Sequence, residues 1–277
     1  MYRYLRYVPK NHASRLMGRL IHARLPKPIA RRLVRWFAST YQIDVDAAGK
    51  PLHEYPSIGH FFIRDLAEGL RPIESDVVSP VDGTLRNFGV VVDGTLEQIK
   101  GKTYTLARFL GDEANAPRYE NGAYFNFYLS PQDYHHIHSP VSGAIARSVH
   151  IPGKLWPVND WSLANVDELF SINERVVTYI DCALGHVAAV MIGATNVGKI
   201  SVVYDSFVSN AFGANRTVVR DYDTPHAIEA GDRLGTFHMG SSVVVLVEPG
   251  QVDVEQVRLK AGHKVQYGAA ILHSAKA

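Results

Sequence analysis

Three short segments of the chain carry side chains that could take part in catalysis. One places a carboxylate in a turn sequence, one holds three histidines within four residues, and one has a serine directly after a glycine. A carboxylate, an imidazole and a hydroxyl are the parts of a catalytic triad, in which the imidazole activates the hydroxyl and the carboxylate orients the imidazole. In chain order the candidates are Asp82, His135, His136, His138 and Ser241.

Each segment also has a purely structural interpretation. The sequence Ser-Pro-Val-Asp-Gly at residues 79–83 is typical of a turn, because proline presets φ and glycine tolerates positive φ. The histidines could lie in a surface loop, or they could bind a metal, since histidine is the commonest metal ligand. The sequence has no acid or cysteine at a familiar ligand spacing from them and no HExxH pattern. A metal-dependent hydrolase is therefore an alternative that chelation would test.

The serine segment favours a chemistry other than ester hydrolysis. The GxSxG pattern of a nucleophile elbow is missing around Ser241. Gly240 can adopt a strained peptide geometry at low cost, so the Ser241 hydroxyl could attack the Gly240 carbonyl from its own side. Two of the histidines, His135 and His138, could then serve as separate proton-transfer groups.

Seven segments resemble, in the same order along the chain, those of the phosphatidylserine decarboxylases, a pyruvoyl-dependent family. Their shared order over nearly the whole chain carries the resemblance. The family often reads Leu-Gly-Ser-Thr at its processing site, whereas this chain reads Met-Gly-Ser-Ser at residues 239–242. Both replacements are mild, so we expect self-cleavage to survive. The segments are 61–66 with 71–73, 79–83, 100–104, 128–140, 170–176, 190–198 and 235–242.

The resemblance implies that Asp82, His138 and Ser241 form a self-cleavage triad. His138 would deprotonate Ser241 while Asp82 holds the imidazole tautomer, and cleavage would fall between Gly240 and Ser241. β-Elimination and loss of ammonia would then leave a pyruvoyl group in place of Ser241. The products would be a large chain of residues 1–240 and a small chain of residues 241–277, which stay associated. The family also suggests a homodimer.

The resemblance further implies decarboxylation of phosphatidylserine to phosphatidylethanolamine. The pyruvoyl carbonyl would form a Schiff base with the serine amine of the lipid and accept electrons as carbon dioxide leaves, so neither pyridoxal phosphate nor a metal is expected. His135 resembles the family histidine linked to decarboxylation and is the candidate acid, whereas His136 is expected to be structural. Tyr128 and Ile137 are candidate contacts to the acyl–glycerol part of the phospholipid.

Two further alternatives follow from the same residues. One is a pyruvoyl decarboxylase of this family that acts on another amine-bearing carboxylate. The other is a membrane-associated β domain that keeps the motif and never cleaves, although the joint presence of Asp82, His135, His138 and Ser241 speaks against it.

The charges of the chain separate an N-terminal segment from the rest. Residues 1–40 contain ten of the 29 lysines and arginines and no acid, which leaves 19 bases and 27 acids in the remainder. Apolar residues recur at helical spacing within 13–21 and 29–37, opposite arginines, and Pro28 is well placed to open the second helix. The pattern predicts two amphipathic helices that pack on the body, lie on an anionic membrane surface, or do both. An organelle transit peptide is an alternative.

The sequence predicts a protein that does not cross the membrane. No apolar run approaches the roughly 20 residues that span a bilayer, and arginines interrupt any secretory apolar region. The broad apolar faces and the absence of a nucleic-acid motif argue against a nucleic-acid partner. We expect a peripheral protein on the cytoplasmic face of the bacterial inner membrane, with an organelle membrane as the alternative. The one cysteine, Cys182, excludes an internal disulfide.

After residue 44 the sequence predicts an α+β fold with a mainly antiparallel, barrel- or sandwich-like body. The chain then divides into a basic helical segment, 1–44, and a β-rich catalytic domain, 45–277. Helical patterns occur at 58–66, 105–110 and 162–170. The predicted strands are 83–92, 95–100, 122–129, 143–150, 175–181, 187–193, 201–208, 242–248 and 252–260.

Overall fold

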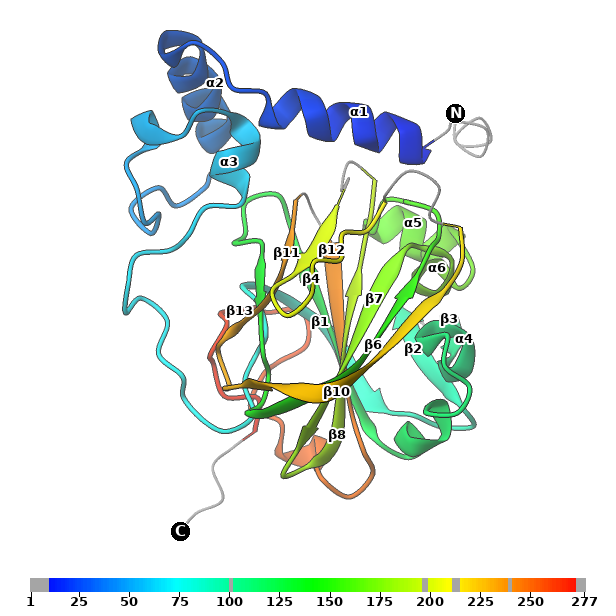
Figure 1. Ribbon diagram of the computed structural model, residues 1–277. Coiled ribbons are helices and arrows are strands. Elements are labelled where there is room, and N and C mark those ends of the chain that lie inside the picture. Colours follow the sequence, from blue (N-terminus) through cyan, green and yellow to red (C-terminus); the bar gives the residue numbers. More distant parts are fainter. Residues whose placement is uncertain (1–9, 100–101, 196–198, 211–214, 239–240, 273–277) are drawn as a thin grey trace.

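The computed structural model describes residues 10–99, 102–195, 199–210, 215–238 and 241–272. Two N-terminal helices, α1 (Lys10–His22) and α2 (Lys27–Thr40), precede a β-rich body, and α1 lies across one end of that body (Figure 1). Pro26 caps α2 and Pro28 lies in its first turn, so the predicted start of this helix is confirmed. Within these ranges no helix is both long and apolar enough to cross a membrane.

The body is built on an eight-stranded antiparallel sheet in the order β10-β6-β7-β8-β12-β4-β1-β13. The predicted α+β class with a mainly antiparallel body is therefore confirmed. The sheet ends at β10 and at β13, so over the described residues it is open and does not close into a barrel. Its strands are β1 (Gly83–Val90), β4 (Ala123–Leu129), β6 (Gly143–Ile151), β7 (Arg175–Cys182), β8 (Gly185–Ile192), β10 (Val218–Ile228), β12 (Ser241–Val247) and β13 (Lys264–Val265).

A second, three-stranded sheet carries the histidine segment, residues 135–138. Its order is β5 (His136–His138), β11 (Arg233–Phe237) and β9 (Ile200–Val202). A hairpin of β2 (Thr95–Ile99) and β3 (Lys102–Thr105) completes the strands. The shorter helices are α3 (Ile58–Phe62), α4 (Leu106–Leu110), α5 (Asp160–Asn165) and α6 (Leu169–Ile172), with 3₁₀ turns η2 (Leu52–Glu54), η3 (Ala116–Tyr119) and η4 (Val254–Gln256).

Strand β12 lies in the centre of the large sheet and is buried at every residue. It pairs along its length with β4 on one side and with β8 on the other. This explains its unbroken apolar run, because a strand covered on both faces has no solvent side that needs polar residues. Burial of each of its valines contributes about 1.5 to 3 kcal/mol.

The helix α2 packs into a smaller hydrophobic cluster, separate from the main core. Val34 and Phe37 of α2 lie against Phe61 and Phe62 of α3, with all four side chains buried. Removal of α2 would therefore expose two large aromatic side chains of α3.

Two of the predicted strands are wrong in whole or in part. The segment 252–260 contains η4 (Val254–Gln256) and no strand, because the Asp253 carboxylate accepts hydrogen bonds from Glu255 N and from Gln256 Nε2. Such local side-chain bonds compete with strand pairing. The predicted strand 201–208 is extended only to Val202 in β9.

Candidate functional site

The three-stranded sheet brings the histidine segment beside the chain that leads to Ser241. In β11, Thr236 lies opposite His136. The backbone N–H of Phe237 donates to the carbonyl of His135 over 2.9 Å. The short pairing of β5 with β11 thus connects two segments that lie 100 residues apart in the sequence.

His138 is buried, and its two ring nitrogens have different partners. Nδ1 lies 2.6 Å from the carbonyl of Gly231, so this nitrogen carries the proton and donates it. Nε2 lies 3.2 Å from the hydroxyl of Tyr134, which donates to the ring lone pair. The ring of Tyr267 stacks parallel to the imidazole with centroids 3.8 Å apart. Burial lowers the pKa of His138 to about 4, so the ring is neutral at neutral pH.

Asp82 is buried beside this ring but bonds to other groups. Arg71 donates to its carboxylate from Nη2 over 2.7 Å and from Nε over 3.2 Å. The backbone N–H of Tyr267 donates to Asp82 Oδ1 over 2.9 Å. Among the described residues no hydrogen bond joins Asp82 to His138, and the Gly231 carbonyl is the group that fixes the imidazole tautomer.

Ser241 is completely buried at the first position of β12, opposite Leu129 of β4. Its Oγ has no hydrogen-bond partner in the part of the chain that the structure describes. The structure therefore places Ser241 in a dry environment but does not hydrogen-bond it to His138. The other side of the predicted cleavage site, Gly240, lies outside the described residues.

His135 is also completely buried, and its ring lies on α3. Its Nδ1 donates to the carbonyl of Asp133 over 2.8 Å, which leaves the lone pair on Nε2. Nε2 has no hydrogen-bond partner among the described residues. The ring of Phe62 lies 3.9 Å from the imidazole, centroid to centroid, and burial lowers the pKa of His135 to about 3.

His136 uses both ring nitrogens within the fold. Nε2 donates to the carbonyl of Ile63 over 3.0 Å, and Nδ1 accepts from the hydroxyl of Thr236 over 2.7 Å. Burial lowers its pKa to about 4. These bonds join the residue after α3 to β11 and leave no ring nitrogen for a substrate, which is consistent with the structural role predicted for His136.

Relatives of the chain share one description. The family model described as phosphatidylserine decarboxylase matches residues 58–273. The chain is 44% identical over 269 residues to the phosphatidylserine decarboxylase proenzyme of Anaeromyxobacter sp. (strain K), covering 95% of this chain and 94% of that protein. It is 39% identical to the proenzyme of Myxococcus xanthus, covering 90% of this chain and 89% of that protein. It is also 39% identical to the proenzyme of Brevibacillus brevis, covering 89% of this chain and 88% of that protein. The chain belongs to the phosphatidylserine decarboxylase family.

Family membership confirms the predicted enzyme class, a decarboxylase of the carboxy-lyase type. The relatives are named as proenzymes, in agreement with a chain that is made as a precursor. No comparison assigns roles to individual residues, so the roles of Asp82, His135, His138 and Ser241 stay predictions. Within the described ranges no cluster of three or more His, Cys, Asp or Glu side chains is arranged to hold a metal ion.

An apolar cavity of about 230 Å³ lies beside the strand that begins at Ser241. Tyr128 lines it and lies opposite Ser242 in the register of β4 and β12. Ile137, by contrast, is completely buried in the main core and does not line this cavity. The lining residues are Phe37, Tyr41, Phe62, Tyr128, Leu129, Pro131, Pro157, Val158, Asn159, Ala194 and Thr195.

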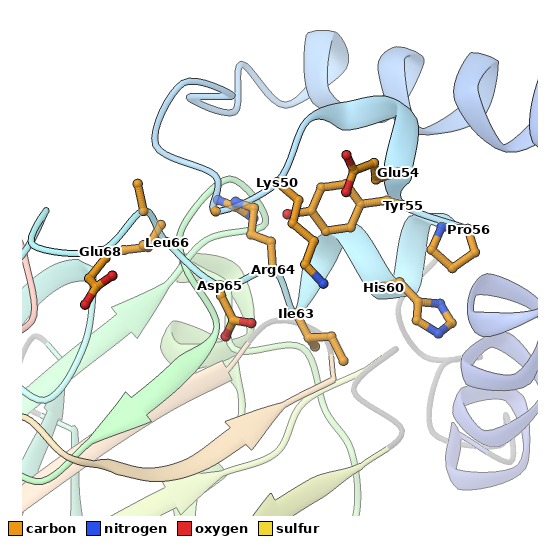
Figure 2. A pocket seen from close by; sticks show the side chains of 12 residues that line it. Lys50, Glu54, Tyr55, Pro56, His60, Ile63, Arg64, Asp65, Leu66 and Glu68 are labelled. Atoms are coloured by element: carbon orange, nitrogen blue, oxygen red, sulfur yellow. The ribbon is translucent and has the colours of Figure 1, made fainter.

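A second, more polar cavity of about 450 Å³ is lined by residues between 49 and 68, from before, within and after α3 (Figure 2). Ile63, Arg64 and Asp65 of its wall follow α3 in the chain. Arg64 is buried and donates from Nη2 to the carbonyl of Gln132 over 2.9 Å. The carbonyl of Ile63 accepts from His136, as described above. The segment after α3 therefore holds the histidine segment from the side of the N-terminal helices.

Four residues that contact the candidate triad in this decarboxylase were not predicted as site residues. They are Arg71, Tyr134, Gly231 and Tyr267. Arg71 belongs to a segment that resembles the family, and Tyr134 directly precedes His135, so both carried some signal in the sequence. Gly231 and Tyr267 carried none, because only the tertiary fold brings them to His138.

Proposed function

We propose that this decarboxylase matures by cleaving itself between Gly240 and Ser241, and that it then converts phosphatidylserine to phosphatidylethanolamine. The observation that carries the proposal is the buried hydroxyl of Ser241, which has no partner among the described residues in a chain of this family. A buried polar atom without a partner is costly, and here it belongs to the serine that the resemblance places at the cleavage site, which supports a use of this hydroxyl in processing. When formed from Ser241, a pyruvoyl group supplies a carbonyl that accepts the electrons released by the departing carboxylate.

Self-cleavage needs a base, a nucleophile and a carbonyl. His138 takes the proton of Ser241, whose Oγ attacks the carbonyl carbon of Gly240. The Gly240–Ser241 carbon–nitrogen bond breaks, and the amide becomes an ester. β-Elimination then releases the carboxylate of Gly240, and water replaces the nitrogen of residue 241, which leaves as ammonia.

The tautomer of His138 suits this role. Because Nδ1–H donates to Gly231, the basic lone pair is on Nε2, where the hydroxyl of Tyr134 now lies. The lowered pKa of about 4 keeps the ring unprotonated and able to accept a proton at neutral pH. Cleavage then requires the Ser241 hydroxyl to replace Tyr134 at Nε2.

His135 is proposed to handle the proton of the decarboxylation stage. Its Nε2 lone pair has no partner among the described residues, and its lowered pKa of about 3 keeps the free ring neutral. A neutral ring cannot act as an acid until it gains a proton. The ammonium group of the substrate must lose one before its nitrogen can react, so His135 can accept that proton and return it to the substrate α-carbon.

The small and large chains are proposed to stay together after cleavage. The small chain would keep β12 between β4 and β8 of the large chain. Lys264 of the small chain also pairs with Asp133 of the large chain over 2.6 Å. Association of two such molecules into a homodimer remains part of the proposal.

Residues 1–44 are proposed as the membrane-contacting segment, ahead of a catalytic domain at 45–277. On α1, Leu16 and Leu20 are each 60% exposed, and on α2, Ile29 is 50% and Trp36 56% exposed. Exposed apolar side chains among arginines suit an anionic lipid surface. Phe37 of α2 lines the apolar cavity beside β12, which could receive the acyl–glycerol part of the substrate near Tyr128. This arrangement supports a peripheral location on a membrane, and the cytoplasmic face is part of the proposal.

Intact mass spectrometry of the purified protein tests the processing. We expect two chains, split after Gly240, with a smaller chain that resists Edman degradation. Ser241→Ala and His138→Ala should give one uncleaved chain, whereas His135→Ala should cleave and fail to decarboxylate. A single uncleaved chain in an active preparation would refute the pyruvoyl mechanism. Equal processing defects in the two histidine variants would refute the division of roles.

Binding to vesicles of phosphatidylglycerol tests the membrane surface. Leu20→Ser with Trp36→Ser should weaken vesicle binding and turnover of phosphatidylserine in vesicles, because both changes remove exposed apolar contacts. Val203→Ser is the matched control, since Val203 is 57% exposed on the body of the protein. Equal binding by the double variant and the control would contradict the proposed surface. Turnover of a soluble amine-bearing carboxylate in place of the lipid would favour the alternative substrate.

A further inference from the structure

Tyr267 contacts both proposed large-chain members of the self-cleavage triad. Its ring stacks on the imidazole of His138, with centroids 3.8 Å apart and planes inclined by 3°. Its backbone N–H donates to Oδ1 of Asp82 over 2.9 Å. Tyr267 lies 26 residues after Ser241, in the part of the chain that would become the small chain.

The backbone around Tyr267 is held firmly against the turn that contains Asp82. Gly268 N–H donates to the Ser79 carbonyl over 3.0 Å, and Ser79 N–H donates to the Ala269 carbonyl over 2.8 Å. Gly268 has a φ of +84°, and a Cβ at this position would lie 2.4 Å from the Pro72 carbonyl oxygen. Glycine is therefore required there, and the turn directs the Tyr267 ring towards His138.

The ring of Tyr267 covers one face of the His138 imidazole, and several charged groups act on the same imidazole. Asp82 and Asp232 favour the protonated form of His138, and Arg233 disfavours it. Tyr134 stacks near the same imidazole, with centroids 5.7 Å apart, and His136 lies on the same strand. Arg71 acts on this group through its ion pair with Asp82. Burial is the largest influence on the pKa of His138, and the stacked tyrosine is part of what buries it.

We propose that Tyr267 is a positioning residue for self-cleavage, which holds the imidazole of His138 in plane and shields it from water. The inference rests on the role of His138 as the base under the proposed function. The ring fixes the direction of the Nε2 lone pair, while the backbone amide fixes Asp82. The segment that will become the small chain thus arranges the groups that release it.

The test follows cleavage of the full chain made by cell-free translation, with pulse labelling and transfer to buffers of different pH. Tyr267→Leu removes the flat ring and keeps an apolar side chain, so water reaches His138 and its pKa rises towards the ordinary value of about 6.5. The base is then protonated over a wider acidic range. We expect this variant to cleave about 30-fold more slowly at about pH 5 than at about pH 8. The parent chain should change by less than about twofold over that range, since burial holds the His138 pKa at about 4.

Tyr267→Phe and Tyr267→Trp are the matched controls, because both keep an aromatic face on His138. We expect both variants to cleave with the pH profile of the parent chain. They test the role of the aromatic ring even if Tyr267→Leu does not fold. Folding is checked by thermal unfolding of each variant in the Ser241→Ala background, where no cleavage occurs. A merely structural role would slow Tyr267→Leu equally at all pH values.

Two outcomes overturn the inference. One is a Tyr267→Leu chain that folds and cleaves with the parent pH profile. The other is a Tyr267→Phe or Tyr267→Trp chain whose acidic limb moves to higher pH. Cleavage of His138→Ala at the parent rate would instead overturn the proposed base itself, so the two failures are distinguishable.

Discussion

The imidazole of His135 lies against the ring of Phe62, with centroids 3.9 Å apart. Phe62 also meets Phe37 of α2 edge-on, with centroids 6.3 Å apart. One aromatic side chain of α3 therefore connects the N-terminal helices to the histidine proposed to act in decarboxylation. Because the contact covers an imidazole that is completely buried, it also helps to keep that imidazole neutral.

Replacement of Phe62 should change the pH dependence of decarboxylation. Phe62→Ala admits water, so the His135 pKa rises from about 3 towards its ordinary value. The proposed role requires His135 to start neutral, so the acidic limb of the kcat/KM profile should move to higher pH. Steady-state kinetics of the processed enzyme on phosphatidylserine in detergent micelles measures this limb.

Phe61→Ala is the matched control for this change. Phe61 is also completely buried in the small cluster, but it packs on Tyr55 and does not stack on His135. Each change should cost about 3 to 5 kcal/mol of stability, since each removes a buried phenylalanine. An acidic limb that moves equally in both variants would show that general destabilisation, not the Phe62 contact, sets the profile.

Acidification should destabilise the precursor because three buried histidines and the partly buried His238 must gain a proton on unfolding. Burial lowers the pKa of His135 and of His238 to about 3, and of His136 and of His138 to about 4. In the unfolded chain each titrates near about 6.5. Their contribution is therefore fully present above about pH 6.5 and is lost as the pH falls towards the folded values.

Urea unfolding of the Ser241→Ala chain between about pH 8 and about pH 5 measures this loss. Each of the four histidines can contribute up to about 1.4 kcal/mol per pH unit below about pH 6.5. His238→Gln should reduce the slope by one such contribution and leave the plateau above about pH 7 flat. A free energy of unfolding that stays constant down to about pH 5 would contradict the neutral state of these rings in the folded chain.

The elements that form the large sheet could be predicted from the sequence to within a few residues. Runs of β-branched residues between glycines gave six of its strands, because their hydrophobic pattern is local. Both edge strands were missed: β10 is mostly exposed and contains a proline, and β13 has only two residues. The three-residue strand β5 was also missed, because two histidines around one isoleucine carry no strand pattern.

The site was predictable as a set of residues but not as a geometry. The sequence suggested a carboxylate that orients an imidazole, whereas Asp82 bonds to Arg71 and to the backbone of Tyr267. Nothing in the local sequence shows that the Gly231 carbonyl will accept from His138. Gly231 and Tyr267 lie 93 and 185 residues away from their partners in the sequence, and only the folded structure brings them together.

Removal of the Arg71 side chain should unfold part of the site because it leaves the Asp82 carboxylate without its charged partner. The two side chains are only 11% and 12% exposed. We expect Arg71→Met to cost roughly 2 to 4 kcal/mol and to slow cleavage of the precursor. Arg258→Met is the control, since Arg258 pairs with Glu74 at the surface and should cost less than about 1 kcal/mol. Equal losses in the two variants would argue against a buried, paired Asp82.

A methyl group at Gly59 should displace α1 from the body. A Cβ at this position of α3 would lie 2.7 Å from Cγ and Nδ1 of His22, in the last turn of α1. Gly18, within α1, has no atom within 4 Å of an added Cβ. Both Gly59→Ala and Gly18→Ala gain the helix propensity of alanine, worth about 1 kcal/mol in a helix interior, so only the steric contact distinguishes them. We expect Gly59→Ala to increase amide hydrogen exchange throughout α1, and Gly18→Ala to decrease it. Similar exchange in the two variants would show that the contact of His22 with Gly59 does not hold α1 on the body. The exposed apolar face of α1 could then meet a membrane without first separating from α3.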